Sequence, residues 1–160
     1  MDSSRLVLVG ASSGGHLAAI TALKYPSLGL AGLVLLNPVL DLHFAEGWSK
    51  REPMRVKLLP WLLNMRYGCE ALNEFSPLNQ VRPLPHPTLI AHGTDDKIVP
   101  FAEVEAFQRE MQCAGNECTV VPFEKQEHQF FNWRVSPSNF ARCVDMLGKF
   151  LSSLQDKKST

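Results

Sequence analysis

The chain has 160 residues, and its 16 basic and 16 acidic side chains balance to a formal net charge of +0. With 45% hydrophobic and 20% charged residues, it has the length and composition of one globular domain with a sizeable core. The charge balance argues against binding to nucleic acid or to an anionic membrane, and no apolar stretch reaches the roughly 18 residues that a membrane-spanning helix needs. Because the amino terminus leads directly into an apolar run, we expect no signal peptide and take the cytoplasm as the default compartment.

A strand, a tight turn and a helix are predicted at the start of the chain. The apolar run 6–9 predicts a buried strand, and the alanine-rich run 16–24 predicts a helix that is covered on most sides. Between them, residues 10–14 read Gly-Ala-Ser-Ser-Gly. A turn this tight strains the backbone of Ser12, and we expect the flanking glycines to remove Cβ atoms that would clash. Ser12 would lie at the amino end of the helix, where the N–H of Ser13 favours a developing negative charge. Glycine-rich turns of this kind also bind phosphate, so the motif alone leaves both interpretations open.

Further strands and helices alternate along the rest of the chain. Apolar runs predict buried strands over 30–36, 87–91 and 118–123, and amphipathic patterns predict helices over about 101–114 and from about 138 onward. Pro122 indicates that the last strand lies at an edge of the sheet or ends there. The segment from about 42 to 82 shows short helices broken by prolines, which we interpret as a lid-like insertion or as ordinary packing. The order predicts a single α/β domain over 1–160, with a parallel sheet of about four strands flanked by helices.

Three of the predicted strands are each followed by a residue that can take part in nucleophilic catalysis. Ser12 follows the first strand, Asp96 the third and His128 the fourth. Because the carboxyl ends of parallel strands meet at one edge of the sheet, we expect these side chains to form a Ser–His–Asp relay. Asp95 is the alternative acid. Asn37 and its neighbour Asp41 follow the second strand and are expected at the same edge, although such residues commonly cap turns.

Three segments of the sequence carry a further signal, and they are Gly-Ala-Ser-Ser-Gly-Gly-His-Leu-Ala from residue 10, His-Gly-Thr-Asp-Asp-Lys-Ile-Val-Pro from residue 92, and His-Gln-Phe-Phe-Asn from residue 128. Together they resemble the α/β-hydrolase superfamily, and most of all its esterase branch, which includes acetyl xylan esterases and related small lipase/esterases. The resemblance implies that Ser12 is the nucleophile and that His128 acts first as general base and then as general acid. It also implies that Asp96 orients the imidazole, because the family pattern His-Gly-Thr-x-Asp selects it over Asp95.

The sequence departs from the family pattern in two places. Gln129 stands where the family usually has Gly. The early strands and the His-Gly-Gly loop that supplies part of the oxyanion hole would precede residue 1, so the chain corresponds to the carboxyl-terminal half of the fold. Ser13 would then supply the remaining oxyanion donor. The strand 6–9 would lack one neighbour, and we expect the chain to self-associate through it or to pair with an amino-terminal fragment.

The function that the resemblance implies is hydrolysis of a small-molecule carboxylic ester through an acyl-enzyme, without a metal or an organic cofactor. Short-chain acyl or acetyl esters, including those of sugars, are the expected substrates. A serine peptidase of the prolyl oligopeptidase kind is the alternative, and so is a non-catalytic remnant that lacks the oxyanion half. Among the other reactive residues, Cys113 and Cys118 are expected to be free thiols, and His16 is expected to be a packing residue.

Overall fold

The computed structural model describes residues 6–43, 70 and 72–156. The described part forms one parallel sheet of four strands, as the alternating pattern predicts, and the strand order is β1-β2-β3-β4. The strands are β1 (Val7–Ala11), β2 (Gly32–Leu36), β3 (Thr88–Gly93) and β4 (Cys118–Phe123). The predicted α/β fold is therefore confirmed, whereas most of the predicted lid-like insertion of residues 42–82 lies outside the described residues.

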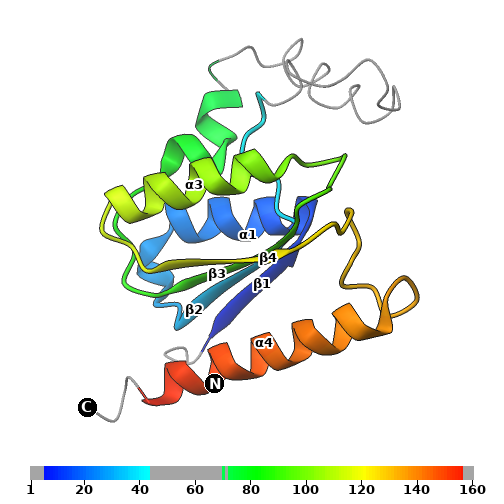
Figure 1. Cartoon of the computed structure of the whole chain (residues 1–160). Coiled ribbons are helices and arrows are strands. Elements are labelled where there is room, and N and C mark those ends of the chain that lie inside the picture. The colour runs from blue at the N-terminus through cyan, green and yellow to red at the C-terminus, as the bar shows by residue number, and fades with distance from the viewer. Residues whose placement is uncertain (1–5, 44–69, 71, 157–160) are drawn as a thin grey trace.

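Helices cover both faces of this sheet. Helices α1 (Ser13–Lys24) and α3 (Phe101–Cys113) lie on one face, and α4 (Pro137–Asp156) runs along the other (Figure 1). Two short 3₁₀ helices, η2 (Pro26–Leu28) and η4 (Pro77–Gln80), belong to the connections. The register aligns Val7 with Gly32, Leu33 with Thr88, and Thr88 with Cys118, so the carboxyl ends of the strands meet at one edge.

Helix α1 begins three residues before the predicted start at residue 16. The two glycines at 14 and 15 are poor helix formers, and for this reason the sequence pattern conceals the true start. The carbonyl of Ser12 accepts the N–H of His16 at 3.1 Å, which closes the first helical turn directly after the turn residue. The helix therefore points its amino terminus at the position of Ser12.

The main core lies between the sheet and the α1/α3 layer. Its completely buried side chains include Leu23 from α1, Leu33 and Leu35 from β2, Ile90 from β3 and Phe107 from α3. A second and smaller cluster lies on the α4 face, where Ala91, Phe123, Phe130 and Cys143 pack together. The burial of apolar area on both faces explains why the strands read as continuous apolar runs.

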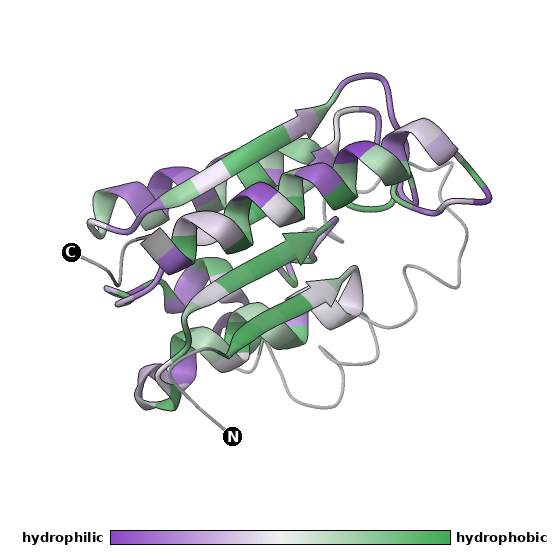
Figure 2. Cartoon of the chain, turned by 90° about the horizontal axis from the view of Figure 1, so that it is seen from below, coloured by the Kyte–Doolittle hydropathy of each residue, from purple (hydrophilic) through white to green (hydrophobic). Residues whose placement is uncertain are grey.

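Strand β1 lies at one side of the described sheet and β4 at the other. Pro122 in β4 fits this position, as the sequence predicts, because proline cannot donate to a further strand. On the β1 side, Val9 is 54% exposed and Leu17 in α1 is 64% exposed. In Figure 2 the apolar strand β1 lies beside α4 and not beneath it.

Candidate active site

Ser12 occupies a strained turn between β1 and α1. Its backbone has φ 53° and ψ −121°, a conformation that a residue with a side chain rarely adopts. The turn is held by the N–H of Ser12, which donates to the carbonyl of Leu36 in the next strand at 2.8 Å. A Cβ atom at residue 10 would lie 2.2 Å from the carbonyl oxygen of Gly14, so this position accepts only glycine.

The structure assigns the other two glycines of the turn differently from the sequence prediction. A Cβ atom at Gly14 would meet no other atom within 4 Å among the described residues, so the expected clash at this position is wrong. Gly15 is the second glycine that is sterically required, since a Cβ atom there would lie 2.9 Å from the Cβ of Pro38. The reason is that α1 begins close to the loop that follows β2, a contact between distant segments that the pentapeptide pattern does not contain.

The structure brings together the three residues that the sequence singled out. His128 Nε2 lies 2.9 Å from Ser12 Oγ, and His128 Nδ1 lies 2.7 Å from Asp96 Oδ2. The loop that carries His128 is anchored by Phe130, which is buried and stacks on Phe123 with ring centroids 4.1 Å apart. An imidazole held between a hydroxyl and a carboxylate in this way can take a proton from the hydroxyl while the carboxylate stabilises the resulting charge.

Asp96, and not Asp95, is the carboxylate that contacts His128. Its Oδ1 accepts the backbone N–H groups of Ile98 at 2.8 Å and Val99 at 3.0 Å. Burial favours the neutral form of Asp96, but hydrogen bonds and the nearby charge of His128 outweigh it and hold the pKa of Asp96 well below its usual range. Asp95 is exposed, and its backbone N–H donates to the carbonyl of Gln126.

Two polar residues beside Asp96 were not predicted as members of the site. Asn37 donates from Nδ2 to Asp96 Oδ2 at 2.8 Å, and His92 Nε2 lies 3.4 Å from the same oxygen. His92 also donates to the carbonyl of Val99 at 2.9 Å. The available signals were the position of Asn37 directly after β2 and the presence of His92 in the His-Gly-Thr-Asp-Asp segment. Neither signal indicates a contact with a particular carboxylate oxygen.

The N–H of Ser13 is available for a ligand. Among the described residues, this N–H forms no backbone hydrogen bond, and Ser13 is the first residue of α1. The amino end of a helix favours negative charge through its free N–H groups and its dipole. The N–H of Ser13 lies directly after Ser12 in the chain, and its role as an oxyanion donor stays a prediction.

The remaining histidines and cysteines lie outside this arrangement. His16 Nδ1 lies 3.2 Å from the carbonyl of Val39, and burial lowers the pKa of His16 against the opposing effect of this bond. Cys113, Cys118 and Cys143 are free thiols, and burial raises the pKa of Cys118 to about 12. Within the described residues there is no cluster of three or more His, Cys, Asp or Glu side chains that could hold a metal. The same part of the chain contains no helix long and apolar enough to cross a membrane.

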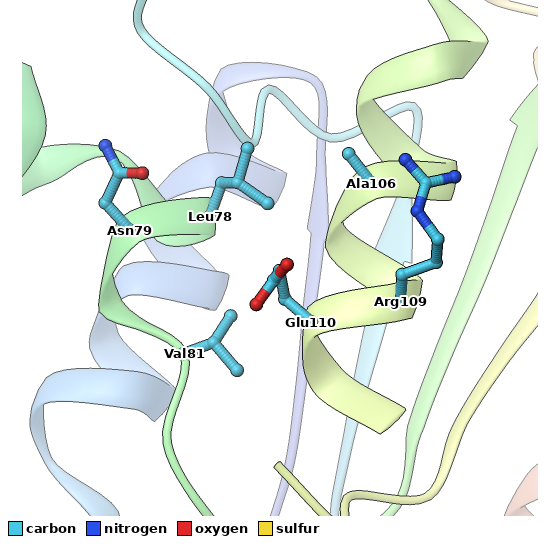
Figure 3. Close-up of a pocket in the computed structure, with 6 residues that line it drawn as sticks. All are labelled: Leu78, Asn79, Val81, Ala106, Arg109 and Glu110. Carbon is cyan, nitrogen blue, oxygen red and sulfur yellow. The ribbon is translucent and has the colours of Figure 1, made fainter. Parts of the chain in front are cut away.

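A separate hollow of about 450 Å³ lies between η4 and α3. Figure 3 shows the side chains that line it, which are Leu78, Asn79, Val81, Ala106, Arg109 and Glu110. None of the residues around Ser12 belongs to this lining. The hollow is therefore distinct from the site at the carboxyl edge of the sheet.

A parallel sheet with a hydrogen-bonded serine and histidine at its carboxyl edge defines the class of α/β-hydrolases. The sequence matches the prolyl oligopeptidase family over residues 1–154, and the chain therefore belongs to this family of serine hydrolases. The predicted resemblance to the α/β-hydrolase superfamily is confirmed. The matched family is the one that the alternative prediction, a serine peptidase, names.

Solved esterase structures are similar to this chain over nearly its whole length. The butyrate-bound structure of esterase 2 from Thermogutta terrifontis is 33% identical with a TM-score of 0.75, and it aligns with 96% of this chain and 58% of its own. The structure of the same esterase phosphonylated by sarin is 30% identical with a TM-score of 0.76 and has the same coverage. The chain thus spans 58% of the length of these structures.

Two curated proteins with different named activities are also similar to this chain. A probable isoprenylcysteine alpha-carbonyl methylesterase of Oryza sativa subsp. japonica is 31% identical over 156 residues, which are 79% of this chain and 34% of that protein. The acylamino-acid-releasing enzyme of Homo sapiens is 25% identical over 161 residues, which are 95% of this chain and 21% of that enzyme. The chain spans about one third or less of the length of these two relatives.

Proposed function

We propose that this chain carries the catalytic residues of a serine carboxylesterase that acts on small esters with short acyl groups. The observation that carries the proposal is the continuous hydrogen-bonded path from Ser12 through His128 to Asp96, which starts at a strained strand-to-helix turn. The similarity to an esterase that binds butyrate favours a short acyl group. Acetyl esters of sugars fall within the same substrate class and are the narrower form of the proposal.

In the proposed reaction, Ser12 Oγ attacks the ester carbonyl carbon while its proton moves to His128 Nε2. The carbonyl oxygen becomes an oxyanion and accepts the N–H of Ser13. His128 then gives its proton to the departing alcohol, and the acyl group remains on Ser12. A water molecule repeats the sequence: it loses a proton to His128, attacks the acyl carbon, and Ser12 regains the proton as the acid leaves. Asp96 remains ionised and holds the imidazole in place throughout.

The test combines a turnover assay with a covalent probe. We expect the chain to hydrolyse p-nitrophenyl acetate or butyrate and to be labelled by a fluorophosphonate, and we expect Ser12→Ala to abolish both. Ser13→Ala is the matched control, because it removes an exposed neighbouring hydroxyl and retains the backbone N–H. Labelling that persists in Ser12→Ala would exclude this serine as the nucleophile.

The family and the human acylamino-acid-releasing enzyme support a second candidate function, cleavage of peptides. A peptide-anilide substrate distinguishes the two functions, since an esterase would prefer the p-nitrophenyl ester and a peptidase the anilide. Failure with both substrates would favour the third alternative, a chain that keeps the fold but catalyses neither reaction.

We also propose that the outer side of β1 pairs with another polypeptide segment, either in a second copy or in an amino-terminal fragment. Unpaired backbone groups next to exposed apolar side chains favour association, and Val9 and Leu17 are both exposed here. Sedimentation at micromolar concentration should show oligomers of the chain on its own, and Val9→Lys should reduce them. A clean monomer of the unchanged chain without a partner would contradict this proposal.

A further inference from the structure

Asn37 is completely buried at the carboxyl end of β2, and its side chain points at the acid of the site. Its Nδ2 donates to Asp96 Oδ2 at 2.8 Å, whereas its Oδ1 has no partner among the described residues. The orientation of the amide is determined by this contact. The reverse orientation would place the Asn37 oxygen against an ionised carboxylate and would leave a buried donor without an acceptor.

Two short hydrogen bonds from different donors meet at Asp96 Oδ2. His128 Nδ1 donates to this oxygen at 2.7 Å, and Asn37 Nδ2 donates to it from a second direction. Asn37 Nδ2 also lies 3.4 Å from His128 Nδ1. Because Nδ1 carries the proton that it donates to Asp96, it has no lone pair for Asn37, and the side chain of Asn37 therefore acts on His128 only through Asp96.

The backbone at residue 37 does not by itself require this amide. Asn37 has φ 44°, in the left-handed region that glycine adopts without strain and that aspartate and asparagine tolerate. Its N–H donates to the carbonyl of Ala91 at 2.9 Å, which any residue except proline could do. The hydrogen bond to Asp96 is the one contact here that depends on an amide group in the side chain.

We infer that Asn37 is a positioning residue for the proposed hydrolysis, which fixes the carboxylate oxygen of Asp96 that accepts the proton-bearing nitrogen of His128. This inference rests on the proposed function. The backbone N–H groups of Ile98 and Val99 hold Asp96 Oδ1. Besides His128, the donor nearest to Asp96 Oδ2 is the Asn37 amide at 2.8 Å, and His92 Nε2 lies farther away at 3.4 Å. A rotation of the carboxylate would draw the imidazole away from Ser12.

The test compares two variants that the backbone accepts. Asn37→Gly removes the side chain and retains the left-handed turn, and Asn37→Asp retains the size but replaces the donor with an acceptor. Lys125→Gly is the matched control, because Lys125 also has a positive φ, of 57°, and its side chain is exposed. Circular dichroism and thermal unfolding establish that each variant keeps the fold.

The decisive readout is the far-downfield proton resonance of His128 Nδ1–H, which reports its hydrogen bond to Asp96. We expect this resonance to move or to broaden through faster exchange in Asn37→Gly and Asn37→Asp, and to stay unchanged in Lys125→Gly. With a p-nitrophenyl ester, kcat should fall by about tenfold to hundredfold in both Asn37 variants, while KM changes by less than about twofold. A second measurement leaves Asn37 intact: its side-chain amide protons should be protected from exchange, and Asp96→Ala should remove the protection.

The outcomes separate this inference from the proposed function. An unchanged Nδ1–H resonance in folded Asn37 variants, or unprotected amide protons at Asn37 in the unaltered chain, would overturn the positioning role even if Ser12-dependent hydrolysis is found. A resonance that depends on Asn37 in a chain that hydrolyses no ester would uphold the arrangement of Asn37, Asp96 and His128 and would overturn the proposed reaction.

Discussion

Two buried carboxyl groups lie close to the start of α3, and they differ in their charge. Asp96 lies in the loop before the helix, where its two oxygens accept hydrogen bonds from Ile98, Val99, Asn37 and His128 at distances of 2.7 to 3.0 Å. Burial favours protonation of Asp96, but these donors and the charge of His128 prevail and keep its pKa below the usual range. Asp96 is therefore ionised at neutral pH.

Glu103, in the first turn of α3, is buried to a similar degree with fewer donors. Its Oε2 accepts the N–H groups of Leu40 and Asp41 at 3.4 and 3.3 Å, and its Oε1 has no partner among the described residues. Burial raises the pKa of Glu103 to about 8, against the opposing effect of these two long hydrogen bonds. Hydrogen-bond donors and neighbouring charges, and not burial alone, therefore decide which of the two carboxyl groups is ionised in this fold.

The largest expected effect comes from removing the charge at Asp96. Asp96→Asn should reduce the kcat of ester hydrolysis by about 10⁴, because an amide no longer holds His128 in the tautomer that accepts the proton of Ser12. Asp95→Asn is the matched control and should stay within about threefold of the unaltered chain, since the Asp95 side chain is exposed. Steady-state kinetics with p-nitrophenyl acetate measure both variants, and the greater loss in Asp95→Asn would reassign the acid.

A smaller effect, on stability, is expected at Glu103. Its pKa in the folded state is about 8, above the ordinary value of 4.5, so the folded chain holds a proton that the unfolded chain releases between these values. The free energy of unfolding therefore falls as the pH rises from about 4.5 to 8. Glu103→Gln does not titrate and should be more stable than the unaltered chain at pH 8, by on the order of 3 kcal/mol, with little difference near pH 4.5.

Urea unfolding at several pH values measures this gap. Glu110→Gln is the control, because Glu110 lies on the same helix and is exposed, and it should leave the pH profile unchanged. If the stability of Glu103→Gln relative to the unaltered chain does not increase with pH, Glu103 is ionised in the folded chain. The contrast between the two carboxyl groups would then be lost.

The fold could be predicted from the sequence because its strands are buried on both faces and give continuous apolar runs. The predicted strand over 118–123 agrees with β4 at both ends, and the helix predicted over 101–114 agrees with α3 to within one residue. The predicted start of α1 was wrong, because Gly14 and Gly15 are poor helix formers. The first turn forms there because the carbonyl of Ser12 accepts the N–H of His16. Glycine propensity is a local property, and here a backbone contact overrides it.

The three central residues of the site could be selected because their order along the chain matches the order of the strands. The roles of Asn37 and Glu103 could not be predicted in this way. Each depends on a contact between segments 59 to 63 residues apart, at the level of single atoms. An asparagine after a strand has the same sequence signature whether it caps a turn or binds a catalytic carboxylate.

The hydrogen bond between Ser12 and His128 joins residues that are 116 positions apart in the sequence. The four strands lie side by side in the order in which they occur along the chain, so every strand must pair with its predecessor before these two side chains can meet. Contacts of such high contact order form late when a domain folds, because the intervening loops must be closed first. Reactivity of Ser12 towards a fluorophosphonate would therefore report the final stage of folding, since it develops only after β4 has docked.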